Sequence, residues 1–263
     1  MNELMTDLLW WQYSLIALIF VWSGFVRTGL GFGGAVLSLP FLLLIVDDPV
    51  IFLPIIGMHL LIFSGSITLA NHLKAKRSGN SGLSENVDWD YLKKSLKIMI
   101  IPKLIGVFGL LTLPNEIMAG LIFVIVIIYS IGYILNKPFR SNRPWVDNLF
   151  LMLGGYVSGT SLIAAPLVMA VFASNVAKAQ LRDTLFVLWF ILVVIKLGSF
   201  VIAGVDLQLI HHFWLLPCAF IGHKLGQRLH SYLVNTNSVL FFKIMGSVLI
   251  ITSTLGLIRS IAL

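Results

Sequence analysis

A glycine-rich stretch that ends in proline, Gly29 to Pro40 (GLGFGGAVLSLP), interrupts an apolar run that is too long for one membrane crossing. A helix cannot continue undisturbed through it, because glycine adds no side-chain packing and proline removes a backbone donor. Inside a bilayer, an interrupted backbone persists only where protein buries it or where it lines a cavity. The stretch is therefore either a tight contact between helices or a binding site.

A second stretch, GYVSGTSLIAAP, repeats this pattern later in the chain. Three pairs of residues share one offset of 126 positions: Gly29 with Gly155, Gly33 with Gly159, and Pro40 with Pro166. We predict an internal duplication, with a first transmembrane repeat at 1–136 and a second at 146–263. The Pro- and Arg-rich segment 137–145 would be the cytoplasmic linker between them.

The composition indicates a membrane protein. Of the 263 residues, 58% are hydrophobic and 11% are charged, whereas a soluble domain carries about 25% charged residues. We predict an all-α, polytopic membrane helical bundle. The net charge of +7 comes from basic residues between apolar runs, which indicates orientation signals and lipid contacts, not a nucleic-acid partner. With Cys218 as the single cysteine in the sequence, we expect no disulfide, metal site or cofactor.

The apolar segments set the expected helices. They lie at 8–28, 30–46, 50–71, 92–113, 116–136, 146–157, 160–175, 184–204, 208–223 and 239–262. A spanning helix needs about 20 residues, and segments 30–46, 146–157 and 160–175 are shorter. Each of these lies beside a glycine-rich break, so we expect re-entrant or discontinuous helices there.

Loop charges predict the orientation of the helices. The loops at 73–91 and 137–145 are rich in Lys and Arg, so both should face the cytoplasm. Each repeat holds five apolar segments, and an odd number makes the second repeat enter from the opposite face. Such inverted repeats hold their substrate near the midplane, between the two copies. The N-terminus has no basic residue before the apolar run, so we expect no cleaved signal peptide, and we expect a multi-pass protein of the cell inner (plasma) membrane.

The GxGG segment leading to proline and the basic segment NHLKAKRSGN, followed by VDWDYL, resemble the TauE/SafE sulfite exporter family, also called the toluene sulfonate uptake permease family. The resemblance covers essentially the whole chain. It implies a secondary transporter, a permease for a small sulfur-containing or organic anion such as sulfite or a sulfonate. The residues that match by position are Gly31, Gly33, Gly34, Pro40, Gly159 and Pro166. Thr160 and Ser161 stand where the family has further glycines, which leaves the substrate open.

Backbone amides near the two breaks are the first candidates for binding an anion. Unpaired N–H groups at a helix N-terminus lie at the positive end of the helix dipole, and glycine allows close approach. Gly33-Gly34 and Ser158 to Ser161 can supply them, and Ser158, Thr160 and Ser161 add hydroxyl donors. Two alternatives stay open: the small residues pack helices together, or the hydroxyls bond their own helix backbone.

Ionisable residues inside apolar runs are the second group of candidates, because an unpaired charge in lipid costs several kcal/mol. Arg27 and Lys196 are predicted substrate-binding residues, and Lys103 is a candidate for lining the path. His59, in the middle of segment 50–71, could relay a proton. The alternatives are that Arg27 extends to the membrane surface and that His59 is a hydrogen-bonded packing residue. His211-His212 lacks a third ligand for a metal.

Most tryptophans lie near the ends of the apolar segments and match an aromatic belt. Trp22 and Trp189 lie deeper in their segments, so these two are further candidates for lining the path.

No P-loop pattern GxxxxGK[ST] occurs in the sequence, so a proton, ion or substrate gradient would drive transport. An anion channel is an alternative. An intramembrane hydrolase is less favoured, because the segment reads GYVSG and no HExxH occurs. A membrane scaffold would need no duplication.

Overall fold

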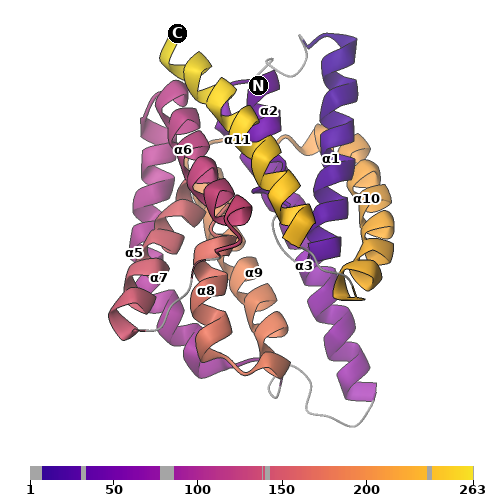
Figure 1. Cartoon of the computed structure of the whole chain (residues 1–263), viewed down its shortest axis with the longest axis vertical. Helices are drawn as coiled ribbons and strands as arrows, with labels where there is room; N and C mark the ends of the chain where they lie inside the picture. The colour runs from indigo at the N-terminus through magenta and orange to yellow at the C-terminus, as the bar shows by residue number, and fades with distance from the viewer. Residues whose placement is uncertain are drawn as a thin grey trace. The chain divides into compact units, whose positions relative to one another are not determined.

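The computed structural model describes residues 8–30, 34–77, 86–137, 139, 143–235 and 239–262. Over these residues the chain is helical throughout and contains no strand. The helices are α1 (Trp10–Leu30), α2 (Leu39–Ile45), α3 (Pro49–Arg77), α5 (Trp89–Thr112), α6 (Asn115–Ile134), α7 (Pro144–Ser161), α8 (Ala165–Asn175), α9 (Lys178–Ile202), α10 (Leu209–Asn235) and α11 (Val239–Ala262) (Figure 1). Each corresponds to one apolar segment of the sequence, which confirms the predicted helical bundle.

Five stretches among the described helices are long and apolar enough to cross a membrane. They are Pro49–Ser66, Trp89–Thr112, Asn115–Ile134, Lys178–Ile202 and Phe242–Ser260. The protein is therefore a multi-pass membrane protein. The predicted short segments remain short in two cases, since α2 has 7 residues and α8 has 11, whereas α7 extends to 18.

The chain forms two compact units, and each takes helices from both halves of the sequence. Unit 1 comprises Met1–Ile55, Thr112–Pro138 and Gly204–Leu263. In it α1 packs along α10 and α6 packs along α11, while α2 contacts α1, α6 and α11. Unit 2 comprises Ile56–Leu111 and Phe139–Ala203, and in it α8 contacts both α7 and α9.

In unit 2, α7 and α8 form an antiparallel helical hairpin (Figure 1). Near its closed end, a β-carbon on Gly154 would lie 2.9 Å from a methyl group of Val168. At its open end, the Asn175 amide donates a hydrogen bond of 3.2 Å to the Asp147 carboxylate. The start of α7 and the end of α8 therefore lie together.

The turn of this hairpin is residues 162–164, which we call the α7 break. Leu162 takes the left-handed conformation with φ of 60° at the C-cap of α7, so the helix cannot continue past Ser161. Pro166 occupies the first turn of α8, where its missing N–H would have no partner inside the helix. Proline here begins a helix; it does not interrupt one.

In unit 1, α1 and α2 form a related hairpin with a longer connection. The Trp22 indole N–H donates a hydrogen bond of 3.0 Å to the carbonyl oxygen of Leu37. The Ser23 hydroxyl donates to the carbonyl oxygen of Gly34 at 3.3 Å, and the buried Ser38 hydroxyl also donates to it. Pro40 again lies in the first turn of the short helix, here α2. These bonds fix the connection between α1 and α2 against the side of α1.

Each unit also contains one place where two parallel helices pack through glycine backbones, which we call a glycine crossing. In unit 2, α7 meets α5: a β-carbon on Gly159 would lie 2.2 Å from the Lys103 carbonyl oxygen, and one on Gly106 would lie 2.3 Å from that of Tyr156. Real β-carbons essentially never come under 3.0 Å, so both positions need glycine. The backbones of α5 and α7 are consequently in direct contact.

The crossing in unit 1, between α1 and α10, has the same pattern. A β-carbon on Gly24 would lie 2.1 Å from the Ala219 carbonyl oxygen, and one on Gly222 would lie 1.9 Å from that of Val21. In both crossings, each glycine faces the backbone carbonyl of the residue that lies three positions before the glycine on the partner helix. Ala219 thus holds the position in unit 1 that Lys103 holds in unit 2.

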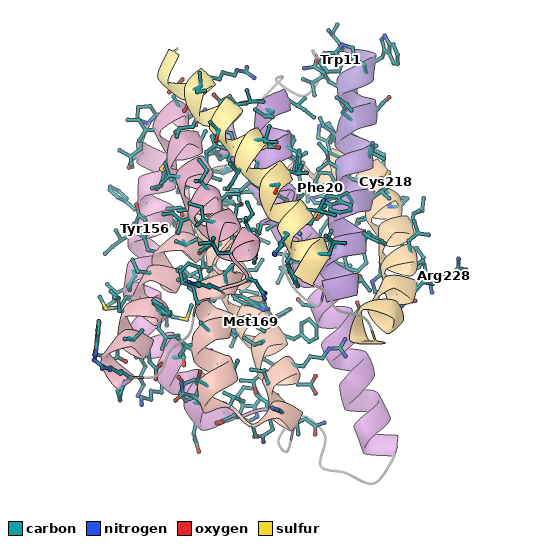
Figure 2. All side chains as sticks on the ribbon, viewed as in Figure 1. Trp11, Phe20, Tyr156, Met169, Cys218 and Arg228 are labelled. Atoms are coloured by element: carbon teal, nitrogen blue, oxygen red, sulfur yellow. The ribbon has the colours of Figure 1, made fainter. Side chains whose placement is uncertain are left out.

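Large apolar side chains cover the outer faces of the helices. Phe108 of α5 is 69% exposed, Ile202 of α9 is 90% exposed and Phe213 of α10 is 84% exposed. In Figure 2, Trp11 lies near the start of α1 and Arg228 lies towards the end of α10. Lipid is the solvent that such faces require.

Candidate functional site: two buried lysines at the end of α7

Two lysine side chains of unit 2 converge on the last turn of α7. The Lys103 amine, from α5, donates hydrogen bonds to the hydroxyl of Ser158 at 2.9 Å and to its carbonyl oxygen at 3.3 Å. The Lys196 amine, from α9, donates to the carbonyl oxygen of Gly159 at 2.6 Å. Neither lysine has any exposed surface. The two amines therefore contact neighbouring residues of one helix end, away from solvent.

The chemistry of this helix end explains the contacts. The last four carbonyl groups of a helix have no partner within it and form the negative end of its dipole. Because α7 ends at Ser161, the carbonyls of Ser158 and Gly159 are among these groups. The two lysines satisfy them and complement the dipole. The site is the C-terminal end of a helix that is capped by two lysine amines.

This geometry corrects one prediction. We expected Ser158 to Ser161 to offer unpaired N–H groups, as at a helix N-terminus, but they form the last turn of α7, where carbonyls are unpaired. The donors that could reach an anion here are the amines of Lys103 and Lys196 and the hydroxyl of Ser158. The break falls after Ser161 and not at Gly159, because Gly159 is held inside the helix by its contact with α5.

The hydroxyls of Thr160 and Ser161 bond their own helix, as the alternative hypothesis had it. Both donate to the carbonyl oxygen of Val157, at 3.2 and 3.1 Å. Ser158 differs, because its hydroxyl accepts a hydrogen bond from Lys103. Of the three hydroxyls predicted to bind substrate, that of Ser158 is the one in contact with a buried cation.

The two amines lie close to one another without an acidic partner in the described part of the chain. Among the described residues, no carboxylate appears among the partners or charge interactions of either lysine. The Lys196 amine also lies 5.4 Å from the centre of the Phe200 ring, which is a favourable cation–π distance. Two buried amines that share a site without an acid in the described chain are candidates for binding an anion.

The lysines lie far along the hairpin from its polar open end. The 11 residues of α8 span about 16 Å at 1.5 Å per residue. That length separates the α7 break from the open end, where Asn175 meets Asp147.

The other predicted site residues of unit 2 are spread over several helices. Pro166 begins α8 and is half-buried, Trp189 of α9 is half-buried, and His59 of α3 is 2% exposed. The part of the chain described here contains no group of three or more potential metal ligands.

Further predicted residues belong to unit 1. Gly34 and Pro40 are buried at the connection and in α2, and a β-carbon on Gly34 would lie 3.0 Å from the β-carbon of Arg27 in the last turn of α1. Trp22 is half-buried and donates its indole N–H to Leu37, so it fastens the connection. Gly31 and Gly33 lie outside the described residues.

Sequence analysis missed the glycine crossings and the convergence of Lys103 with Lys196. The sequence did contain one signal for the crossings: Gly106 and Gly222 each lie in an apolar run that follows a Val-Asp pair. No local signal shows that lysines on two separate helices reach one turn of a third. That contact depends on which helices pack together.

Buried lysine amines at a helix break of a multi-pass helical bundle are typical of membrane transporters. The sequence model of the sulfite exporter TauE/SafE family matches residues 16–255, and the chain belongs to that family. Its members are membrane transporters of the sulfite or anion exporter type and not enzymes. Comparison with curated proteins gives no match, and comparison with solved structures gives none.

Proposed function

We propose that this protein is a secondary transporter that carries a small sulfur-containing or organic anion, such as sulfite or a sulfonate, across the cell inner (plasma) membrane. The observation that supports the proposal most directly is the pair of buried amines, Lys103 and Lys196, at the α7 break without a carboxylate partner in the described chain. Burying two lysine amines is costly because they lose their hydration. A neutral donor would cap a helix end as well, so capping alone does not account for two lysines.

The donors suit an oxyanion. Ammonium groups and a serine hydroxyl form strong, charge-assisted hydrogen bonds to sulfite, sulfonate or carboxylate oxygens. Lys103, Lys196 and Ser158 present three such donor groups at one helix end. Gly159 then serves the site by bringing α7 and α5 close enough for Lys103 to reach Ser158.

Alternating access between inverted repeats is the mechanism we favour. Each unit has a parallel glycine crossing with the same spacing and a hairpin of one long and one short helix. In each crossing, the first helix of one proposed repeat packs against a later helix of the other, as α1 does with α10 and α7 with α5. This pattern supports an internal duplication with repeats at 1–136 and 146–263.

The same duplication would give the α1–α2 hairpin a related role, with Arg27, Gly34 and Pro40 as its part of the substrate path. A proton or ion gradient would drive transport, because the sequence lacks a P-loop. His59 is the proposed proton relay: it is a buried imidazole within a span of the unit that holds the lysines.

Transport into vesicles tests the proposal. The purified protein is reconstituted in liposomes, and uptake of labelled sulfite, methanesulfonate and acetate is measured with and without an imposed pH gradient. We expect saturable transport of at least one anion, reduced about tenfold or more in Lys103→Met and Lys196→Met, because each change removes a charged hydrogen-bond donor.

Matched controls are available on the same helices. Lys97 of α5 and Lys178 of α9 are exposed, so Lys97→Met and Lys178→Met should retain transport. Failure of the wild type to carry any of the three anions would refute the proposal. Equal transport rates in all four variants and the wild type would show that Lys103 and Lys196 take no part in transport.

A further inference from the structure

We propose that the transported anion and the end of α7 compete for the same two ammonium groups, so that anion binding uncaps α7 and releases the α7 break. This inference rests on the proposed function and adds a link between binding and conformational change. A transporter needs such a link, because a ligand can shift an equilibrium only through contacts that differ between the two states.

The first step concerns the hydrogen bonds of the amines. Both bonds of Lys103 go to Ser158, and the bond of Lys196 goes to the carbonyl oxygen of Gly159. A neutral carbonyl is a weaker acceptor for an ammonium group than a charged oxyanion. An anion that reaches the site therefore takes these donors from the helix end.

The second step concerns what the lysines hold in place. Without them, the carbonyls of Ser158 and Gly159 would be buried and unpaired, which is unfavourable in an apolar interior. Leu162, directly after this turn, has a φ of 60°, a conformation that disfavours any residue with a β-carbon. The capped turn holds this unfavourable backbone in place, and loss of the caps allows the last turn of α7 to rearrange.

The third step limits where the movement occurs. The open end of the hairpin is fastened by Asn175 and Asp147, and Gly154 is in contact with Val168 further in. Pro166 cannot donate a backbone hydrogen bond to a rearranged last turn of α7. Movement on uncapping is therefore confined to the closed end of the hairpin, residues 158–166, beside the bound anion.

Hydrogen exchange of backbone amides tests this step directly. Full-length protein in lipid nanodiscs is exposed to heavy water with and without saturating sulfite, and peptides covering 158–166 are followed by mass spectrometry. We expect sulfite to speed exchange in this segment severalfold in the wild type. Lys196→Met should exchange rapidly without sulfite and show no further change when sulfite is added.

Controls separate this effect from general loosening. Peptides from the outer part of α9, near Lys178, should be unaffected by sulfite, and Lys178→Met should behave as the wild type. A second variant, Lys103→Gln, guards against misfolding of Lys196→Met, and it too should lose the sulfite response.

Binding is measured by calorimetry on the same samples. Sulfite that binds while exchange at 158–166 stays unchanged or slows overturns this inference and leaves the proposed function standing. Absence of binding by sulfite, together with absence of transport of all three anions, overturns both.

Discussion

Gly159 and Lys103 touch through their backbones, and the same lysine reaches forward to Ser158 with its side chain. One residue of α5 thus forms the helix contact with its carbonyl group and the cationic site with its amine. The contact between α5 and α7 and the position of the charge are inseparable. Changes to the glycine and changes to the amine should therefore have different but predictable effects.

Gly159→Ala should disrupt the crossing in unit 2. The added carbon would lie 2.2 Å from the Lys103 carbonyl oxygen and 2.9 Å from the Val107 backbone nitrogen, and neither backbone can yield cheaply. We expect a loss of about 1–3 kcal/mol in stability and loss of transport, measured by thermal unfolding in detergent and by vesicle uptake. The matched control is Gly198→Ala on α9, where an added carbon meets nothing within 4 Å. It should leave stability unchanged or raise it by up to about 1 kcal/mol.

Gly222→Ala should have a comparable effect in unit 1. The new carbon would meet the Val21 carbonyl oxygen at 1.9 Å and the Phe25 backbone nitrogen at 2.8 Å. Thermal unfolding should show a loss of similar size, because the two crossings share one pattern. Gly120→Ala on α6 is the control, since its nearest neighbours are side-chain atoms of Ser260 and Leu257 at 3.3 and 3.7 Å. If Gly222→Ala unfolds like the wild type, the two crossings do not share this role.

Lys196→Met should separate stability from function. Methionine avoids the cost of burying an amine, but it leaves the Gly159 carbonyl without its donor, and these two effects on stability oppose each other. We expect the melting temperature of Lys196→Met to stay within a few degrees of the wild type, while transport falls about tenfold or more. A fall of several degrees in melting temperature would indicate that the amine is chiefly a structural cap.

Asp47→Asn should make unit 1 less sensitive to pH. Asp47 follows α2, and burial raises the pKa of its carboxyl above the ordinary value of 3.8, with smaller contributions from Glu116 and Asp48 and an opposing one from Arg259. A raised pKa in the folded state means that stability is greatest at low pH and falls as pH rises through that pKa. The amide variant should therefore melt higher than the wild type at pH 7.

The comparison at low pH completes this test. Below the ordinary pKa both side chains are neutral, so the two melting temperatures should converge. A difference that is constant from pH 3 to pH 8 would show that ionisation of Asp47 is not its cause.

The positions of the helices could be predicted because apolar length is a strong and local signal. Each predicted apolar segment became a helix, and both proline-terminated stretches end in the first turn of the short helix of a hairpin. Whether unpaired N–H groups or unpaired carbonyl groups lie at the second connection could not be predicted. A shift of the break by a few residues, from Gly159 to Leu162, turns expected amide donors into carbonyl acceptors, and that shift depends on the packing of Gly159 against α5.

The pairing of equivalent residues was also beyond the sequence. A common offset pairs Gly159 with Gly33, whereas the crossings pair Gly159 with Gly24. The connection after α1 is longer than the one after α7, so an alignment that matches the prolines mismatches the crossings. Likewise, Lys103 and Lys196 were separate candidates in sequence, and their meeting on α7 follows from the packing of three helices.

The contact of α1 with α10 has a consequence for how this protein is made. Helix α1 completes its packing only after α10, which ends at Asn235, has been synthesised. Until then the bare backbone at Gly24 lacks its final neighbour, so all the helices between α1 and α10 must be synthesised before unit 1 can close. Premature termination before α10 should therefore yield products that quality-control proteases in the membrane degrade rapidly.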